Sequence, residues 1–203
     1  MAGEVDAAAG AAATRLVLVR HGETAWSKAG RHTGRTDVPL TDAGRDQARQ
    51  MGRALAGRTF SRVVVSPMSR AQETARLAGF GERIETLDDL REYDYGVYEG
   101  RTRADILGDV PGWSVWTHPM LEGESLAELA ARADRVIAAL LPTGGDVLVV
   151  SHGHFLRELA TRWIGADPAA GSRLELWTAT VSELGWEHDN RVIEVWNAAP
   201  AAL

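Results

Sequence analysis

The stretch that decides the fold of this chain is Leu16-Val17-Leu18-Val19-Arg20-His21-Gly22-Glu23-Thr24. It starts with an unbroken apolar run, and such a run predicts a strand buried on both faces of a parallel sheet. Arg20 and His21 follow directly, at the edge where open α/β sheets bind ligands. Arginine offers a permanent cation with a fork of donors for phosphate, and histidine is a nucleophile or proton carrier near neutral pH. The Arg20-His21 pair alone is weak evidence for a binding site. The interpretation therefore depends on further polar residues at the ends of other strands.

The composition limits the class of protein. A net charge of −6 argues against a nucleic-acid or membrane-surface partner, because either would require a basic face. The absence of cysteine excludes disulfides, thiolate metal sites and cysteine catalysis. No apolar run approaches the roughly 20 residues of a membrane-spanning helix. Residues 1–13 are rich in Ala and Gly and do not resemble a secretory signal. We therefore expect a flexible tail over 1–13, a single domain over 14–203 and a cytoplasmic protein, either monomer or homodimer.

Apolar runs and amphipathic stretches alternate along the first three quarters of the chain. Further strands are expected at 63–65, 84–87 and 147–150, and helices are expected after Thr41, after Ser125 and around Phe155. Thr41 is a good N-cap, and Ser125 forms a capping box with Glu128. The helix after the second strand has two possible starts. Either Ser66 is its N-cap, with Pro67 at the first position, or Ser69 is its N-cap and Gln72 closes a capping box.

The remaining segments complete the predicted architecture. Residues 174–196 alternate between apolar and polar, which predicts two strands joined by a turn at 188–190. Residues 101–124 have little periodicity, so we expect a short helix followed by an irregular cover over part of the sheet. Strands alternating with helices predict an α/β three-layer sandwich, with a mostly parallel central sheet and helices on both faces.

Polar groups follow several of these strands or lie in adjacent loops. Arg20 and His21 follow the first strand, Arg70 the second, and His152 the strand at 147–150, while Glu92 lies in a loop after the weak strand at 84–87. Two guanidinium groups in one pocket are costly unless an anion neutralises them, so the expected ligand is a phosphate or similar oxyanion. We also expect the backbone N–H groups at the starts of the helices after Ser66 and Ser151 to help bind this anion.

An ordered set of motifs resembles the histidine phosphatase superfamily, which has the phosphoglycerate mutase-like fold. The motifs are residues 18–24, 34–41, 66–67 with Arg70, 90–100 and 151–153, and the resemblance extends from about 15 to 196. Five stretches also resemble the acid phosphatases of this superfamily and, less closely, its sedoheptulose bisphosphatases: residues 26–27, 31–34, 93–96, 115–118 and 151–155. One motif alone would be weak, but their order along the chain is specific.

The resemblance implies catalytic roles for five residues. His21 attacks phosphorus and forms a phosphohistidine. The non-bridging oxygens are held by Arg20, Arg70 and His152, because phosphoryl transfer relies on positioning and cationic donors. Glu92 protonates the leaving oxygen and then takes a proton from the attacking water.

Further residues are expected to bind the phosphate or the substrate. Ser27 stands where many family members have Asn, and its hydroxyl can donate only one hydrogen bond. We therefore expect Thr33 and the backbone around Gly34 to assist. His154 is expected to contact substrate rather than a metal, because two nearby arginines repel a cation. The resemblance implies no cofactor and no metal.

The predicted function is that of a metal-independent phosphomonoester hydrolase of the histidine acid phosphatase type, acting on small phosphorylated metabolites. Two alternatives stay open: a phosphoglycerate mutase, and a sugar bisphosphatase such as sedoheptulose-bisphosphatase. Mutases of this family usually close their site with a basic tail, and residues 198–203 contain no cation, which favours hydrolysis. The predicted cover at 101–124 is expected to select the substrate.

Overall fold

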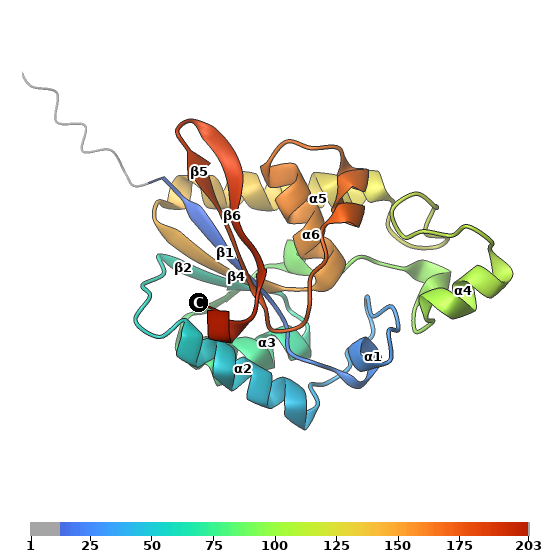
Figure 1. Cartoon of the computed structure of the whole chain (residues 1–203), viewed down its shortest axis with the longest axis horizontal. Helices are drawn as coiled ribbons and strands as arrows, with labels where there is room; N and C mark the ends of the chain where they lie inside the picture. The colour runs from blue at the N-terminus through green and yellow to red at the C-terminus, as the bar shows by residue number, and fades with distance from the viewer. Residues whose placement is uncertain (1–12, 203) are drawn as a thin grey trace, which may run out of the picture.

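The computed structural model describes residues 13–202, so the predicted N-terminal tail lies almost entirely outside the described part. A six-stranded sheet forms the centre, in the order β3-β2-β4-β1-β5-β6 (Figure 1). The strands are β1 (Arg15–Arg20), β2 (Arg62–Val65), β3 (Ile84–Thr86), β4 (Asp146–Ser151), β5 (Val181–Glu187) and β6 (Asn190–Ala198). The first four pair in parallel, and β5 and β6 add an antiparallel edge.

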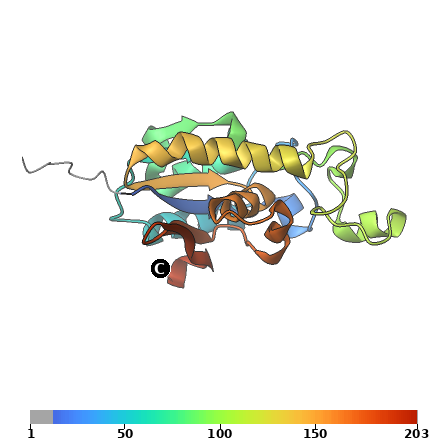
Figure 2. The same ribbon diagram turned by 90° about the horizontal axis from the view of Figure 1, so that it is seen from above.

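Helices cover both faces of this sheet, which confirms the predicted α/β layering. The helices are α1 (Ala25–Lys28), α2 (Asp42–Ala54), α3 (Ser69–Ala75), α4 (Arg103–Asp109), α5 (Leu126–Leu140) and α6 (Gly153–Trp163). Figure 2 shows α5 running along the length of the sheet. Among residues 13–202, no helix is long and apolar enough to cross a membrane.

Neighbouring residues of the central strands point to opposite faces, as strand geometry requires. Leu16 and Leu18 of β1 pack in a core cluster with residues of α5 and α6. Val17 and Val19 pack in a second cluster with residues of α2 and α3. Because β1 is buried on both sides, its carboxyl end is held rigidly, and that end carries Arg20 and His21.

The helix starts agree with the predictions at two places and differ at a third. The Thr41 side chain accepts a hydrogen bond at the start of α2, and Ser125 and Glu128 form the predicted capping box. Both predicted starts of α3 are wrong, because its N-cap is Met68, which makes no side-chain cap. Ser69 instead donates its N–H and hydroxyl to Asp37, so the polar groups at this helix start bind another loop.

The predicted terminal strand pair is confirmed only from Val181 onward. Residues 174–180 form a connecting segment in which Ala179 has a left-handed φ of 54° and its N–H donates to the Arg20 carbonyl. The predicted cover is present as α4 followed by irregular chain, and Figure 1 shows α4 far from the sheet. Trp113 and Trp116 belong to this cover, and both are buried.

Candidate active site

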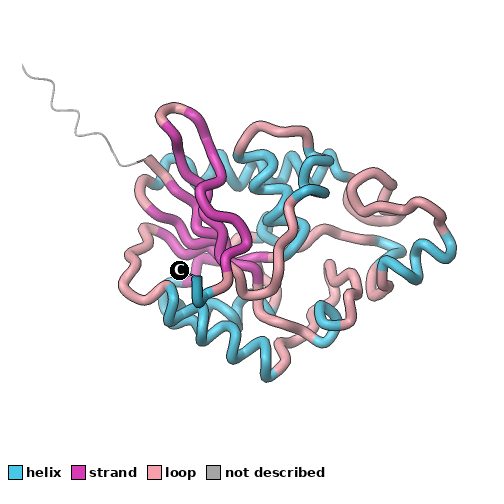
Figure 3. The backbone as a smooth tube through the Cα atoms, in the orientation of Figure 1, coloured by secondary structure: helices cyan, strands magenta, loops and turns pink. Residues whose placement is uncertain are grey.

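A small pocket of about 190 Å³ lies at the carboxyl end of β1. Figure 3 shows that loops gather around this end of the sheet. The pocket is lined by Arg20, His21, Ser27, Gly30, Arg31, His32, Thr33, Glu92, Tyr95 and His154. The structure therefore brings the predicted nucleophile and the predicted acid to one cavity.

His21 is held in the form that a nucleophile needs. Its Nδ1 lies 2.7 Å from the Gly22 carbonyl oxygen, which can only accept, so Nδ1 carries the proton and Nε2 keeps its lone pair. Burial and the positive charges of Arg70 and Arg20 lower the pKa of His21 well below 6.5, against a smaller opposing effect of the Gly22 carbonyl. The imidazole is consequently neutral at physiological pH.

Arg20 has a free donor beside this imidazole. Its Nη1 donates to the Leu176 carbonyl at 2.5 Å, but its buried Nε has no hydrogen-bond partner among the described residues. A buried unpaired N–H is unfavourable. Arg20 lines the pocket, so its guanidinium places a positive charge there. Gly153 permits the guanidinium to approach, since a Cβ there would lie only 3.2 Å from the Arg20 Cζ.

Arg70 and His152 lie against the nucleophile but bond to protein atoms. The His152 ring centroid is 5.1 Å from that of His21. Arg70 Nε donates to His152 Nδ1 at 3.2 Å, which leaves the ring proton on Nε2, 2.7 Å from the Ser66 hydroxyl oxygen. Neither side chain is among those that line the pocket. Their predicted contacts with the phosphate oxygens therefore need a change in these hydrogen bonds.

The same side chain of Arg70 also fixes the loop that follows the nucleophile. Its Nη atoms donate to the carbonyl oxygens of Thr33, Gly34 and Thr36, at 3.2, 3.2 and 3.0 Å. Arg70 is fully buried, so these bonds replace the water that it loses. It acts in this structure as a structural link between α3 and the 33–36 loop.

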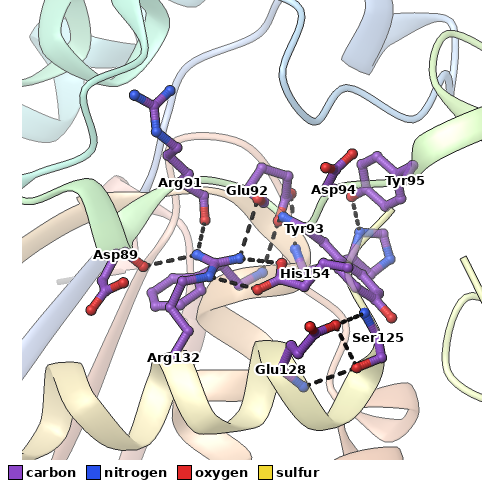
Figure 4. A network of polar contacts seen from close by, with 12 residues as sticks. Asp89, Arg91, Glu92, Tyr93, Asp94, Tyr95, Ser125, Glu128, Arg132 and His154 are labelled. Carbon is purple, nitrogen blue, oxygen red and sulfur yellow. Dashed lines mark hydrogen bonds and ion pairs between the residues drawn. The ribbon is translucent and has the colours of Figure 1, made fainter. Parts of the chain in front are cut away.

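Glu92 accepts hydrogen bonds from backbone N–H groups (Figure 4). Tyr93 and Phe155 donate to its Oε1 at 2.9 and 2.8 Å, and His154 donates to its Oε2 at 3.1 Å. The last two groups are the start of α6, where the helix dipole favours a negative charge. Glu92 therefore occupies two of the N–H groups that were expected to bind the ligand anion at this helix start.

The predicted phosphate-binding groups near Ser27 are also partly occupied. The Ser27 hydroxyl lines the pocket, but it donates to the Thr24 carbonyl and accepts from the Thr24 N–H in a capping box. The Gly34 N–H donates to both oxygens of Glu99, and Gly34 lines a different cavity. Thr33 does line the pocket, although its hydroxyl donates to the Arg31 carbonyl at 3.1 Å.

His32, Tyr95 and His154 also line the pocket. Only His154 among them was predicted as a contact, although Tyr95 lies three residues after the acid in a recognised motif. The Tyr95 hydroxyl and His154 Nδ1 share a hydrogen bond of 2.6 Å. The imidazole rings of His32 and His154 stack with their centroids 6.1 Å apart. Burial lowers the pKa of both histidines and raises that of Tyr95, so all three are neutral near pH 7.

His32 belongs to a short paired segment. Its N–H donates to the Arg101 carbonyl at 2.9 Å, its carbonyl accepts from Gly100 at 2.8 Å, and Arg31 pairs with Thr102 in an antiparallel bridge. His118, by contrast, accepts from the Ser114 N–H in the cover, away from the pocket. Within residues 13–202, no three His, Asp or Glu side chains gather as a metal site requires.

A larger cavity of about 600 Å³ shares only Glu92 with the small pocket. Three arginines line it, and each has a carboxylate partner: Arg35 with Asp94, Arg91 with Asp88 and Arg132 with Glu124, at 2.6, 2.7 and 2.6 Å. Positive charge that is already paired attracts an anion weakly. The free donor of Arg20 and the nucleophile therefore identify the smaller pocket as the candidate active site.

The family model of the histidine phosphatase superfamily (branch 1) matches residues 16–199. The chain belongs to this superfamily. An acid phosphatase of Mycobacterium tuberculosis is 46% identical over 185 residues, which cover 89% of this chain and 91% of the relative. The yeast sedoheptulose 1,7-bisphosphatase of Saccharomyces cerevisiae is 32% identical and is covered over 68% of its length, against 74% of this chain.

A solved structure from Mycobacterium tuberculosis, described as a functionally characterised open reading frame, has the same fold. It superposes with a TM-score of 0.87 at 44% identity, covering 92% of this chain and 98% of that one. The phosphoglycerate mutase-like fold and the phosphatase predicted from the sequence are thereby confirmed for this histidine phosphatase.

Proposed function

We propose that this histidine phosphatase hydrolyses small phosphomonoesters through a phosphohistidine at His21, without a metal ion. The observation that carries the proposal is that one pocket is lined by a neutral imidazole, His21, whose Nε2 keeps its lone pair, and by the guanidinium of Arg20. The guanidinium groups of Arg20 and Arg70 supply the positive charge that a phosphoryl group requires.

In the first step His21 Nε2 forms a bond to phosphorus while the ester oxygen leaves and takes a proton from Glu92. In the second step water attacks the phosphohistidine, Glu92 takes a proton from that water, and inorganic phosphate leaves. His21 Nδ1 stays bonded to the Gly22 carbonyl in both steps, so the ring keeps its orientation.

The size and walls of the pocket favour a small, hydroxylated leaving group. About 190 Å³ accommodates a phosphoryl group and a few further heavy atoms. The neutral side chains of His32, Tyr95 and His154 offer hydrogen-bond donors and acceptors in its wall. The proposed partner is a small phosphorylated metabolite in the cytoplasm. The net charge of −6 does not argue against it, because the arginines of the site oppose that sign locally.

Acid-quenched and alkali-quenched reactions with a ³²P-labelled phosphomonoester test the intermediate. We expect labelled protein that survives alkali and is lost in acid, and we expect none in His21→Asn. His118→Asn is the matched control, because His118 lies outside the pocket. Labelling that persists in His21→Asn, or turnover without labelling, contradicts the proposal.

The phosphoglycerate mutase alternative predicts a different product. A mutase transfers phosphate within phosphoglycerate and releases little inorganic phosphate. We expect phosphate release to exceed isomerisation when 3-phosphoglycerate is supplied, as measured by ³¹P NMR of the product mixture. Isomerisation without release would favour the mutase.

A further inference from the structure

Arg132 of α5 lies directly behind the predicted acid (Figure 4). Its guanidinium has five N–H groups, and the structure gives it five acceptors. Nε and Nη2 donate to the two carboxylate oxygens of Glu124, at 2.8 and 2.6 Å. Nη1 donates to the carbonyl oxygens of Asp89 and Arg91, at 2.8 and 2.6 Å, and Nη2 also donates to that of Glu92, at 3.3 Å.

Three of these acceptors are carbonyl groups of the segment that carries the acid. A loop backbone has several accessible conformations, and fixing one costs about 1–2 kcal/mol per residue. The planar fork of Arg132 holds Asp89, Arg91 and Glu92 in one conformation, because the three carbonyls must point to the same group. Glu124 neutralises the buried charge that makes this arrangement possible.

The Arg132 guanidinium also contacts Phe155, whose backbone N–H binds the Glu92 carboxylate. Its Cζ lies 4.7 Å from the ring centroid of Phe155, in a cation–π contact. The Phe155 N–H donates to Glu92 Oε1 at 2.8 Å. Arg132 therefore contacts both the backbone that carries the acid and the residue that orients its carboxylate.

We infer that Arg132, charge-balanced by Glu124, is a positioning residue that fixes the Glu92 carboxylate for proton transfer to the leaving oxygen. This inference rests on the proposed function, in which Glu92 is the general acid. A proton donor works only within hydrogen-bond reach of its target, and a misplacement of about 1 Å can cost about 100-fold. Neither Arg132 nor Glu124 lines the small pocket, so they act through Glu92.

Leaving-group dependence tests the inference. An alkyl ester such as glycerol 3-phosphate needs a protonated leaving oxygen, whereas p-nitrophenolate leaves without a proton. The value of kcat/KM includes only steps up to departure of the leaving group. In Arg132→Lys, which keeps the charge but cannot bond to the three carbonyls together, we expect kcat/KM for the alkyl ester to fall about 10- to 100-fold. The value for p-nitrophenyl phosphate should change much less.

Arg135→Lys is the matched control. Arg135 lies one turn further along α5 and binds the side chain of Asp89, at 2.8 and 3.0 Å, but none of the three carbonyls. It should leave the ratio between the two esters unchanged. In a Glu92→Gln background, Arg132→Lys should not lower kcat/KM for the alkyl ester any further, because Arg132 acts only through the Glu92 carboxylate that is already removed.

Equal losses on both esters, or additive effects in the double variant, overturn the inference while leaving the phosphohistidine in place. A wild-type protein that hydrolyses neither ester and forms no phosphohistidine overturns the proposed function instead. Circular dichroism shows whether Arg132→Lys is folded. If Arg132→Lys is not folded, Glu124→Gln is used in its place, because it removes the negative charge that balances Arg132. It should lower the ratio of kcat/KM for the alkyl ester to kcat/KM for p-nitrophenyl phosphate. An unchanged ratio refutes the positioning role.

Discussion

Arg20 and Arg132 are both guanidinium groups near Glu92, and they differ in how their donors are used. Arg20 lines the pocket and has a buried Nε without a partner among the described residues. Arg132 has a partner for every N–H and does not line the pocket. The comparison teaches that two guanidinium groups beside the same carboxylate can differ in use: Arg20 contributes a wall of the pocket, whereas Arg132 holds the backbone that carries Glu92.

The two sides of the site follow the same division. On the nucleophile side, the buried Nε of Arg20 has no partner among the described residues, and a buried unpaired N–H is unfavourable. On the acid side, Glu92 accepts from three N–H groups and its backbone is held by Arg132. The general acid is thus positioned by α5 and the start of α6, whereas Arg20 and His21 are presented by the end of β1.

The largest expected effect comes from Glu92→Gln, which removes the proton but keeps the shape. We expect kcat/KM for an alkyl phosphate to fall by about 10²- to 10⁴-fold, the usual contribution of a general acid. Steady-state assays with glycerol 3-phosphate measure it. Asp94→Asn, two residues along and outside the small pocket, is the control; a comparable loss there would show that any change in this segment is harmful.

Arg20→Gln tests the free donor. Removing one preorganised donor from a site of developing charge costs on the order of 10²- to 10³-fold in rate, and vanadate inhibition should weaken in parallel. Arg15→Gln is a matched control at the other end of β1, since its Nε is also buried and unpaired but its Nη2 binds Glu183. If Arg20→Gln and Arg15→Gln lose activity equally, the loss in Arg20→Gln does not come from a contact with the ligand.

Glu158 of α6 extends the comparison to carboxylates, because both of its oxygens are buried without a partner among residues 13–202. Burial raises its pKa from 4.5 to about 8, so between these values the unfolded chain is ionised and the folded chain is not. The free energy of unfolding therefore falls as pH rises through this window. The stability of Glu158→Gln relative to the parent protein should be greater by about 3.5 kcal/mol at pH 8 than at pH 5.

Urea unfolding of both proteins at the two pH values measures that difference. A constant difference would mean that Glu158 is ionised in the folded protein and has a partner in solution. Glu158 does not line either cavity, so activity at pH 5 should be unchanged.

The smallest expected effect is on the titration of His21. Arg20 and Arg70 both lower its pKa, after burial, the largest cause. Arg20→Gln removes one positive charge, so the pKa of His21 should rise while remaining below that of a free imidazole, because burial still lowers it. A ¹⁵N NMR titration of the imidazole nitrogens reports it, with Arg15→Gln again as control. A lower pKa in Arg20→Gln would contradict the assigned role of the guanidinium charge.

Much of the fold was predictable because local signals and burial agree. The apolar runs of β1 and β4, the Thr41 cap and the Ser125 capping box all follow from short-range chemistry. The start of α3 was not predictable, because Ser69 bonds to Asp37, which is distant in sequence. Residues 174–180 also differ from their alternating pattern, since Ala179 bonds to the carbonyl groups at the end of β1.

The site shows the same limit. The sequence indicated His21, Arg20 and Glu92, which the structure places in one pocket. It did not indicate that Glu92 occupies the start of α6, that Glu99 takes the Gly34 N–H, or that Arg132 uses every donor on nearby groups. These are competitions between partners for the same hydrogen bond, and their outcome depends on three-dimensional distances that residue type and order do not contain.

The pairing of His32 with residues 100–102 has a consequence for engineering. Because the histidine and the start of the cover are bonded through their backbones, the cover is not an independent module. Grafting residues 101–124 from a relative would carry over one half of a two-stranded unit and leave the other behind. An exchange intended to transfer substrate preference should therefore include residues 30–33 in the same graft.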